Sequence, residues 1–400
     1  MGDYRHTLTD GTSRAQRVAF YRNPRVRSAV AQLALLVVLL WLGYEFVLNA
    51  KLNIEAQHIG QGFGFLKNTA GFGVNQSLIP YNESDTYGRV FLVGLLNTLL
   101  IAGLGAVLAT ILGFVIGIAR LSPNWLLARL AGGYVELVRN LPLLFQILFW
   151  YLAVLGTLPG PRQSISLFGE IYLNNRGAIV PAPVFGPGAS YAGYALLIAV
   201  MCSLGLRHWA KIRQARTGRP FPVAIVTALL LDGLPLIALA AAGWPLRFEL
   251  PELRGFNFVG GVRLIPEFIA LLLGLTIYTA AFIAEIVRAG ILAVPRGQTE
   301  AAYALGLSRR LTLRLVIVPQ ALRVIVPPLT NQYLNLTKNS SLAVAIGYPD
   351  LFAVFAGTAL SQTGQAIEII AITMTVYLSI SLLTSAFMNW YNARIALVQR

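Results

Sequence analysis

The sequence GQTEAAYALGLSRRLTLRLVIVP, residues 297–319, is a mostly polar and basic stretch between two long apolar runs. It contains a Glu-Ala-Ala triplet that begins at Glu300, a glycine at Gly306 and a proline at Pro319. The rest of the chain consists largely of residues suited to lipid. We therefore expect this segment to contact a soluble partner, and it decides between the classes of protein considered below.

The composition is that of a membrane protein. Of the 400 residues, 56% are hydrophobic and 12% are charged, whereas about a quarter of the residues of a soluble domain are charged. The formal charge of +15 comes from short basic clusters at the ends of apolar runs, where arginine meets lipid phosphate; this favours a membrane over nucleic acid. The single cysteine, Cys202, excludes a disulfide framework. No cleavable signal peptide is expected.

The apolar runs predict an all-α polytopic membrane protein with about eight spanning helices, because a span needs about 20 mainly apolar residues. Counts of seven or nine stay open, since the fourth run is short and the seventh is polar. The predicted spans are 30–48, 91–118, 133–157, 190–206, 221–246, 264–287, 315–336 and 366–388.

The basic residues predict the orientation. With eight spans, every arginine-rich segment falls on the N-terminal side, and the opposite loops 49–88, 158–189 and 247–263 carry both signs. Cytoplasmic loops are enriched in Lys and Arg, so both termini are expected in the cytoplasm. The basic residues are Arg14, Arg17, Arg22, Arg25 and Arg27; Arg120 and Arg129; Arg207, Lys211, Arg213, Arg216 and Arg219; and Arg296, Arg309, Arg310 and Arg314.

Nucleotide-binding loops are missing from the sequence. Gly60, Gly62 and Gly64 do not have the G-x-G-x-x-G spacing of a dinucleotide site, and no strand is expected before them and no helix after them. The phosphate-binding motif G-x-x-x-x-G-K-[ST] does not occur either. If this protein works with ATP, a separate subunit must hydrolyse the ATP.

Other polar or small residues in the apolar runs have structural interpretations. Gly113 and Gly117 allow a second backbone to approach closely, within this chain at least as readily as on a second subunit. Glu285 and Arg288 lie on one helix face and neutralise each other. Glu136 and Arg139 repeat this spacing, but one short echo establishes no internal repeat. Asp232, next to Gly233, predicts a structural or re-entrant role.

The segment 297–319 predicts a helix–glycine–helix projection. Thr299 can cap a helix that starts at Glu300, alanines give it a smooth face, and Gly306 can end it in the left-handed conformation. A second short helix carries Arg309 and Arg310. A helix lying on lipid is the alternative, but it requires bulky apolar residues instead of alanine.

This pattern resembles the EAA motif of the membrane subunits of ABC importers, with Val316 and Val318 where Ile and Leu are usual. The surroundings are similar to polar amino-acid permeases, most of all the general L-amino-acid subtype. The resembling stretches are Asn97-Thr98-Leu99, Ala119-Arg120-Leu121-Ser122, Tyr134 to Arg139, Leu141 to Leu144, Glu285 to Arg288, Gly297-Gln298, Pro319 to Arg323, and Lys338 to Leu342.

The resemblance implies a five-helix permease core plus extra helices and a set of partners. It implies ABC ATPase subunits that bind ATP and Mg, a second related permease in a heterodimer, and a periplasmic amino-acid-binding protein. The chain itself needs no cofactor and is expected in the bacterial inner membrane. The residues implied to couple to the ATPase are Glu300, Ala301, Ala302, Gly306, Arg309, Arg310 and Pro319, with lipid phosphate an equally good partner for the two arginines.

The resemblance also implies the division of the chain, with an insertion whose purpose the sequence does not give. The expected parts are a cytoplasmic segment 1–28, a first span 29–48, a periplasmic loop 49–88, core parts 89–157 and 263–390, an inserted segment 158–262 with two spans, and a cytoplasmic tail 391–400.

A polar series predicts the substrate path. Asn331, Asn335 and Asn339 recur every four residues, hence on one helix face, which should turn toward a cavity or a partner helix. The turn 347–350 breaks the helix after it, and interrupted helices commonly surround transporter sites. The candidate path residues are Asn331, Asn335, Lys338, Asn339, Ser340 and Ser341; helix packing alone explains the asparagines about as well.

Three rival classes fit less well. An ion-driven secondary transporter predicts inverted repeats and paired intramembrane acids, and the sequence shows neither of them convincingly. A membrane enzyme requires converging catalytic groups, but His6, His58 and His208 lie far apart in the sequence. A purely structural protein would not need the polar seventh span.

Overall fold

The computed structural model describes residues 24–56, 62–219 and 221–395 and divides into two units at Gly62 and Phe63. Within the described residues, seven helices are long and apolar enough to cross a membrane, or eight if one bent pair counts as a span. The prediction of about eight spans is confirmed. The predicted segments 1–28, 49–88 and 391–400, with His6 and His58, fall wholly or partly outside these residues.

The first unit is a single helix, α1 (Pro24–Ala56), with a membrane-length apolar stretch at Arg27–Asn49. Nearly all of its described side chains are exposed, Leu33 to 65% and Phe46 to 76%. A helix with no buried face within its own unit is suited to lipid.

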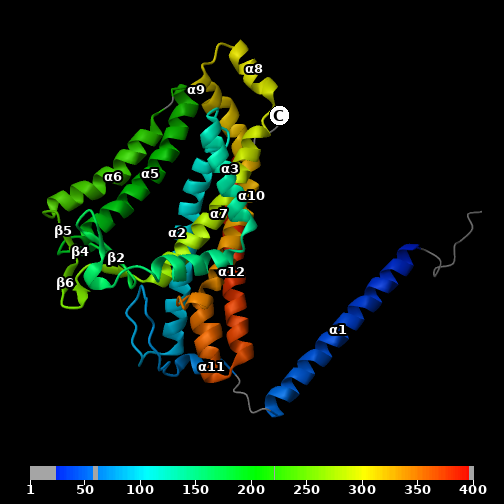
Figure 1. Cartoon of the computed structure of the whole chain (residues 1–400). Helices are drawn as coiled ribbons and strands as arrows, with labels where there is room; N and C mark the ends of the chain where they lie inside the picture. The colour runs from blue at the N-terminus through cyan, green and yellow to red at the C-terminus, as the bar shows by residue number, and fades with distance from the viewer. Residues whose placement is uncertain (1–23, 57–61, 220, 396–400) are drawn as a thin grey trace, which may run out of the picture. The chain divides into compact units, whose positions relative to one another are not determined.

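The second unit is a bundle of long helices with the short segments that join them (Figure 1). Its long helices are α2 (Tyr87–Ala119), α3 (Trp125–Asn140), α5 (Ser190–Thr217), α6 (Val223–Ala241), α7 (Pro266–Leu292), α10 (Val318–Asn339) and α12 (Ala366–Ile395). Its short helical elements are η2 (Phe63–Lys67), α4 (Leu143–Leu148), η3 (Phe149–Leu155), η4 (Pro161–Gln163), α8 (Arg296–Ala304), α9 (Arg309–Thr312), η5 (Leu313–Ile317), η6 (Ser340–Ile346), η7 (Phe352–Ala359) and α11 (Leu360–Thr363).

The predicted third span, 133–157, is not one straight helix. The chain bends by 107° between α3 and the α4–η3 segment. Pro142 follows the break, and the residue before a proline is disfavoured in helical conformation. Leu141 is accordingly extended, with ψ of 131°. The Gln146 amide donates to the Val138 and Leu141 carbonyls at 2.9 and 3.0 Å, which replaces part of the lost helical bonding.

The loops 158–189 and 247–263 contain eight short strands that the sequence analysis did not predict. One antiparallel sheet has the order β1–β2–β3–β8, and two further pairs are β4–β5 and β6–β7. We call these strands with η4 the β module. The strands are β1 (Ile165–Leu167), β2 (Ile171–Asn174), β3 (Gly177–Val180), β4 (Ala182–Phe185), β5 (Leu246–Glu249), β6 (Glu252–Arg254), β7 (Asn257–Val259) and β8 (Val262–Leu264).

Close packing of α2 on α7 forms the centre of the bundle. A Cβ at Gly113 would lie 2.6 Å from Ile283, and one at Gly117 would lie 2.7 Å from the Ala284 carbonyl. Since only glycine fits here, the G-x-x-x-G packs within this chain. The α7 side chains Leu271, Leu275 and Ile283 are fully buried.

Candidate functional site

The segment 296–317 joins α7 to α10 as a helix–glycine–helix; we call it the coupling segment. Gly306 has φ of +75°, so its predicted left-handed conformation is confirmed. Its N–H donates to the Tyr303 carbonyl at 2.9 Å, and the Leu307 N–H to the Ala302 carbonyl at 3.1 Å. These bonds satisfy carbonyls at the end of α8. Ser308 then caps α9 by accepting from the Leu311 N–H at 3.4 Å.

The predicted helix cap at Thr299 is wrong. Helix α8 begins at Arg296, directly after Pro295, so Thr299 lies within the helix. Proline has a fixed φ and no N–H to satisfy, and both properties suit it to the start of a helix. Glu300 consequently lies in the second turn, where the positive end of the helix affects it less.

The coupling segment presents most of its predicted residues to solvent. Glu300, Ala301, Gly306, Arg309 and Arg310 are exposed, Pro319 is half-buried and Ala302 is buried. Leu305, which directly follows the alanine face that the sequence predicts, is the most exposed large apolar side chain of the segment, at 81%. An exposed leucine next to a glycine turn is a feature that a partner's groove can bury.

Packing ties this segment to the bundle. The Gln320 amide of α10 donates to the Gln298 oxygen of α8 at 3.2 Å. Near the end of α7, a Cβ on Gly290 would meet Ile325 of α10 at 2.3 Å, so these two helices touch. The coupling segment thus joins two helices that are packed on each other near its ends.

Charged residues near the end of α7 form an ionic cluster. Arg288 donates to Glu285 at 2.6 Å, as the sequence predicts, and Arg120 at the end of α2 binds the same carboxylate. The three side chains are 16% to 32% exposed. Arg139, by contrast, lies over the Phe282 ring at 5.1 Å. The cluster holds α2 and α7 together at one end.

The predicted substrate-path residues lie on α10 and η6. Asn331, Asn335 and Lys338 are exposed, and Asn339 is half-buried. The hydroxyl of Ser340 donates to the Thr337 carbonyl at 2.7 Å, and that of Ser341 to the Lys338 carbonyl at 2.8 Å. The rest of this chain leaves most of the asparagine face open, so a cavity or a partner helix outside the chain remains the prediction for it.

After the asparagine face, the helical chain of α10 and η6 ends at the turn 347–350. The buried side chain of Asn97, whose role sequence reasoning missed, binds the backbone of this turn. The Asn97 amide, fully buried in α2, donates to the Gln76 carbonyl at 2.8 Å and to the Pro349 carbonyl at 2.9 Å. Thr98 accepts from the Leu351 N–H at 3.0 Å. One dipeptide of α2 thus satisfies the backbone of the turn 347–350 and ties the loop before α2 to it. The sequence marked this dipeptide as a polar pair within an apolar run and as part of a resembling stretch, but neither signal indicated its contact with the turn.

Asp350 in this turn is also fully buried. Its carboxylate accepts from the Ala353 N–H at 2.8 Å and from the Tyr377 hydroxyl of α12 at 3.1 Å. A buried carboxylate needs such donors. A cavity of about 390 Å³ adjoins the turn, lined by residues 72–75 and by Val344, Gly347 and Pro349.

A bundle of membrane-length helices with an exposed glycine-centred projection defines a multi-pass membrane protein. The family described as "Binding-protein-dependent transport system inner membrane component" matches residues 105–397. The chain belongs to this family, which confirms the resemblance to ABC importer permeases and disfavours the secondary-transporter alternative.

Relatives extend the similarity over nearly the whole chain. The General L-amino acid transport system permease protein AapQ of Rhizobium johnstonii is 52% identical over 98% of both chains. The Putative amino-acid ABC transporter permease protein YhdX of Escherichia coli is 55% identical over 95% of this chain and 97% of that protein. The Glutamate/glutamine/aspartate/asparagine transport system permease protein BztB of Rhodobacter capsulatus is 44% identical over 94% and 95%.

Proposed function

We propose that this chain is the permease subunit of an ATP-driven importer of L-amino acids and that the coupling segment is its contact with a separate ABC ATPase. The observation that carries the proposal is the exposed helix–glycine–helix at 296–317, which the chain joins to α7 and α10 and which the Gln320–Gln298 hydrogen bond ties to α10. The names of three relatives that share nearly the full length support amino acids as the substrate class.

The proposed assembly follows from this. ATP and Mg bind to the partner ATPase, a second related permease completes the path, and a periplasmic binding protein delivers the amino acid. Both termini and the coupling segment are proposed to face the cytoplasm of a bacterium, because the arginine-rich segments share one side. The exposed asparagine face of α10 is proposed to line the path between the two permeases.

Replacement of Gly306 by Asp tests the coupling role. At φ of +75° an Asp is strained less than most side chains, so the main change is a negative charge next to Leu305. We expect at least a tenfold loss of binding-protein-stimulated ATPase activity in the reconstituted importer. Gly218→Asp is the matched control, because Gly218 has φ of +69°, open space around it and a place at the end of α5. Equal stimulated ATPase activity in the Gly306→Asp and Gly218→Asp variants would contradict the proposal that the coupling segment contacts the ATPase.

Replacement of Asn335 and Asn339 by Ala tests the path. Uptake of a labelled L-amino acid into proteoliposomes should fall several-fold at unchanged protein level, because substrate loses polar partners at membrane depth. Asn389→Ala, at an exposed asparagine of α12, is the control. Unchanged uptake in the double variant would contradict the proposal that Asn335 and Asn339 line the substrate path and would favour helix packing as their role.

A further inference from the structure

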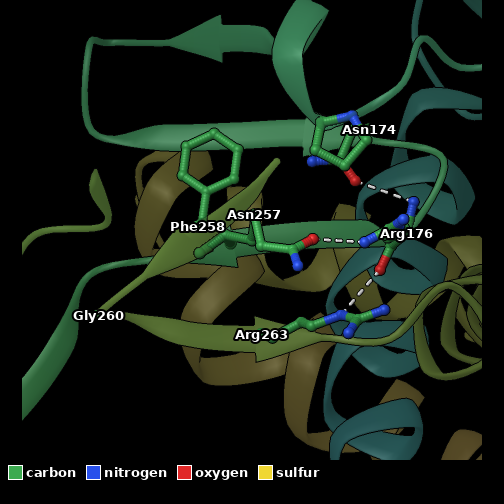
Figure 2. A pocket seen from close by; sticks show the side chains of 8 residues that line it. Asn174, Arg176, Asn257, Phe258, Gly260 and Arg263 are labelled. Carbon is green, nitrogen blue, oxygen red and sulfur yellow. Dashed lines mark hydrogen bonds between the residues drawn. The ribbon is translucent and has the colours of Figure 1, made fainter. Parts of the chain in front are cut away.

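The β module contains a cavity lined by two arginines. It measures about 310 Å³ and is bounded by Asn174, Arg176, Asn257, Phe258 and Arg263, among others (Figure 2). Arg176 follows β2, Arg263 lies on β8, and Asn257 and Phe258 lie on β7. Two segments of the inserted region and Arg263, at the start of the second core part, therefore build this site, and none of its residues belongs to the coupling segment or the asparagine face.

The arginines are held by neutral partners. Arg176 donates to the Asn257 oxygen, and Arg263 donates to the Arg176 carbonyl at 3.3 Å (Figure 2). The backbone N–H of Arg176 donates to the side-chain oxygen of the fully buried Asn174 at 2.9 Å. Among the described residues neither guanidinium forms an ion pair, whereas Arg254 of the same module pairs with Glu252 at 3.1 Å. Glu249 lies on the Gly260 side of the cavity, 3.0 Å from where a Cβ of Gly260 would be.

This arrangement selects an anion. Two exposed guanidinium groups, each with one hydrogen bond to a neutral oxygen, have further N–H donors whose geometry matches a carboxylate. The lining has two arginines and no acidic side chain, and Glu249 lies next to it, so the site favours an anion over the zwitterion of a free amino acid. A carboxylate without a neighbouring ammonium, such as an acidic side chain of a protein, is the better match.

The chain path places the cavity across the membrane from the coupling segment. Strand β8 precedes α7 and the coupling segment follows it, and α7 is long enough to span a bilayer. Next to the cavity, Arg162 lies over the Phe256 ring at 3.8 Å, and that ring is 70% exposed. Exposed aromatic and arginine side chains are enriched in protein interfaces.

We propose that this cavity receives an acidic side chain of the periplasmic binding protein and that the β module is a docking site for it. The inference rests on the proposed function, which supplies that partner. It gives the inserted segment 158–262 a purpose, which is to hold Arg176 beside Arg263, the first residue of the following core part, and to display the two arginines to a soluble protein.

The test uses the full importer in nanodiscs with its purified binding protein. In the Arg176→Gln, Arg263→Gln double variant we expect the Kd for the binding protein to rise at least tenfold and to depend less on salt, since the charge pairing is lost. Basal ATPase activity should not change. The matched control, Arg254→Gln, should bind within about twofold of the wild type. The Arg176→Lys, Arg263→Lys variant keeps the charge and should recover part of the affinity, which separates charge from folding.

Three results would overturn the docking site. One is an unchanged Kd in the double variant while the wild-type importer is stimulated normally. Another is binding of free L-glutamate to the importer alone that the double variant loses, and the third is loss of anionic-vesicle binding only. If the wild type is not stimulated by any binding protein, the proposed function itself fails.

Discussion

The pair α2 and α7 and the pair α5 and α6 are all apolar enough to span a membrane, yet they are packed in opposite ways. Along α7, side chains such as Leu271, Leu275 and Ile283 are fully buried. Along α6, whose residues are all described, Thr227 alone is buried. Ile225 and Leu229 of α6 are 65% and 66% exposed. Apolar sequence alone therefore does not separate a helix of the core from a helix that faces lipid.

Small and polar residues make the difference. The α2–α7 contact relies on glycines that let backbones meet and on an ionic cluster at one end, whereas α5 and α6 pack mainly against each other. Within a membrane the hydrophobic effect does not drive helices together. Helices there associate through close van der Waals packing and through hydrogen bonds and ion pairs. The β module lies at one end of the α5–α6 pair, since β4 leads into α5 and β5 follows α6.

The largest effect is expected from a side chain inserted between α2 and α7. In Gly113→Val the new Cβ would lie 2.6 Å from Cβ of Ile283, which cannot rotate away. We expect destabilisation of about 3 kcal/mol, at the upper end of overpacking costs. Thermal unfolding in detergent, followed by tryptophan fluorescence, measures it.

Gly205→Val in α5 is the matched control, because nothing lies within 4 Å of a Cβ there. Its unfolding temperature should stay close to that of the wild type. Equal destabilisation of both variants would mean that α5 is packed as tightly as α2, and the contrast between the two helix pairs would fail.

The ionic cluster should give the next largest effect. Glu285→Gln leaves Arg120 and Arg288 without their shared carboxylate in a partly buried place. We expect a loss of about 1–3 kcal/mol, less than for a fully buried pair, measured as a lower unfolding temperature.

Glu252→Gln in the β module provides the comparison. Glu252 and Arg254 are 68% and 70% exposed, and exposed pairs contribute about 0–1 kcal/mol. High salt should remove the small effect of Glu252→Gln and leave most of the Glu285→Gln effect. A larger effect at Glu252 than at Glu285 would contradict the assignment of the core.

The sequence predicts those features that depend on local chemistry. Apolar runs locate the spans, Gly306 ends α8 in the left-handed conformation, and the turn 347–350 interrupts the helix. One local prediction, the helix cap at Thr299, was wrong, and the bend within the third span was not predicted, because prolines were overlooked. Pro295 starts α8 ahead of Thr299, and Pro142 bends the third span.

Features that depend on distant contacts could not be read from the sequence. The β module joins strands on either side of α5 and α6, with Ile179 opposite Arg263, and strands of three or four residues carry little pattern of their own. Asn97 binds a carbonyl 252 positions away. Arg176 and Arg263 meet in one cavity only because β3 pairs with β8.

The smallest effect is expected at the turn between β1 and β2. Phe168 has φ of +57° and is 96% exposed, although a side chain in the left-handed region costs about 1–2 kcal/mol except for Asn and Asp. The β module thus retains local strain at a solvent-facing tip, whereas the α2–α7 core uses glycine where space is short. Phe168→Asn should relieve the strain, since Asn-Gly is favoured in such hairpin turns.

We expect Phe168→Asn to slow amide hydrogen exchange in β1 and β2 by up to about fivefold, which corresponds to about 1 kcal/mol, with no change in the core helices. Phe168→Ala removes the ring but keeps an ordinary residue at positive φ, so it should give no slowing. Faster exchange in both variants would show that the exposed ring itself stabilises the hairpin, through lipid or a bound protein. The β module would then gain a second contact with its surroundings, at the end of β2 opposite Arg176.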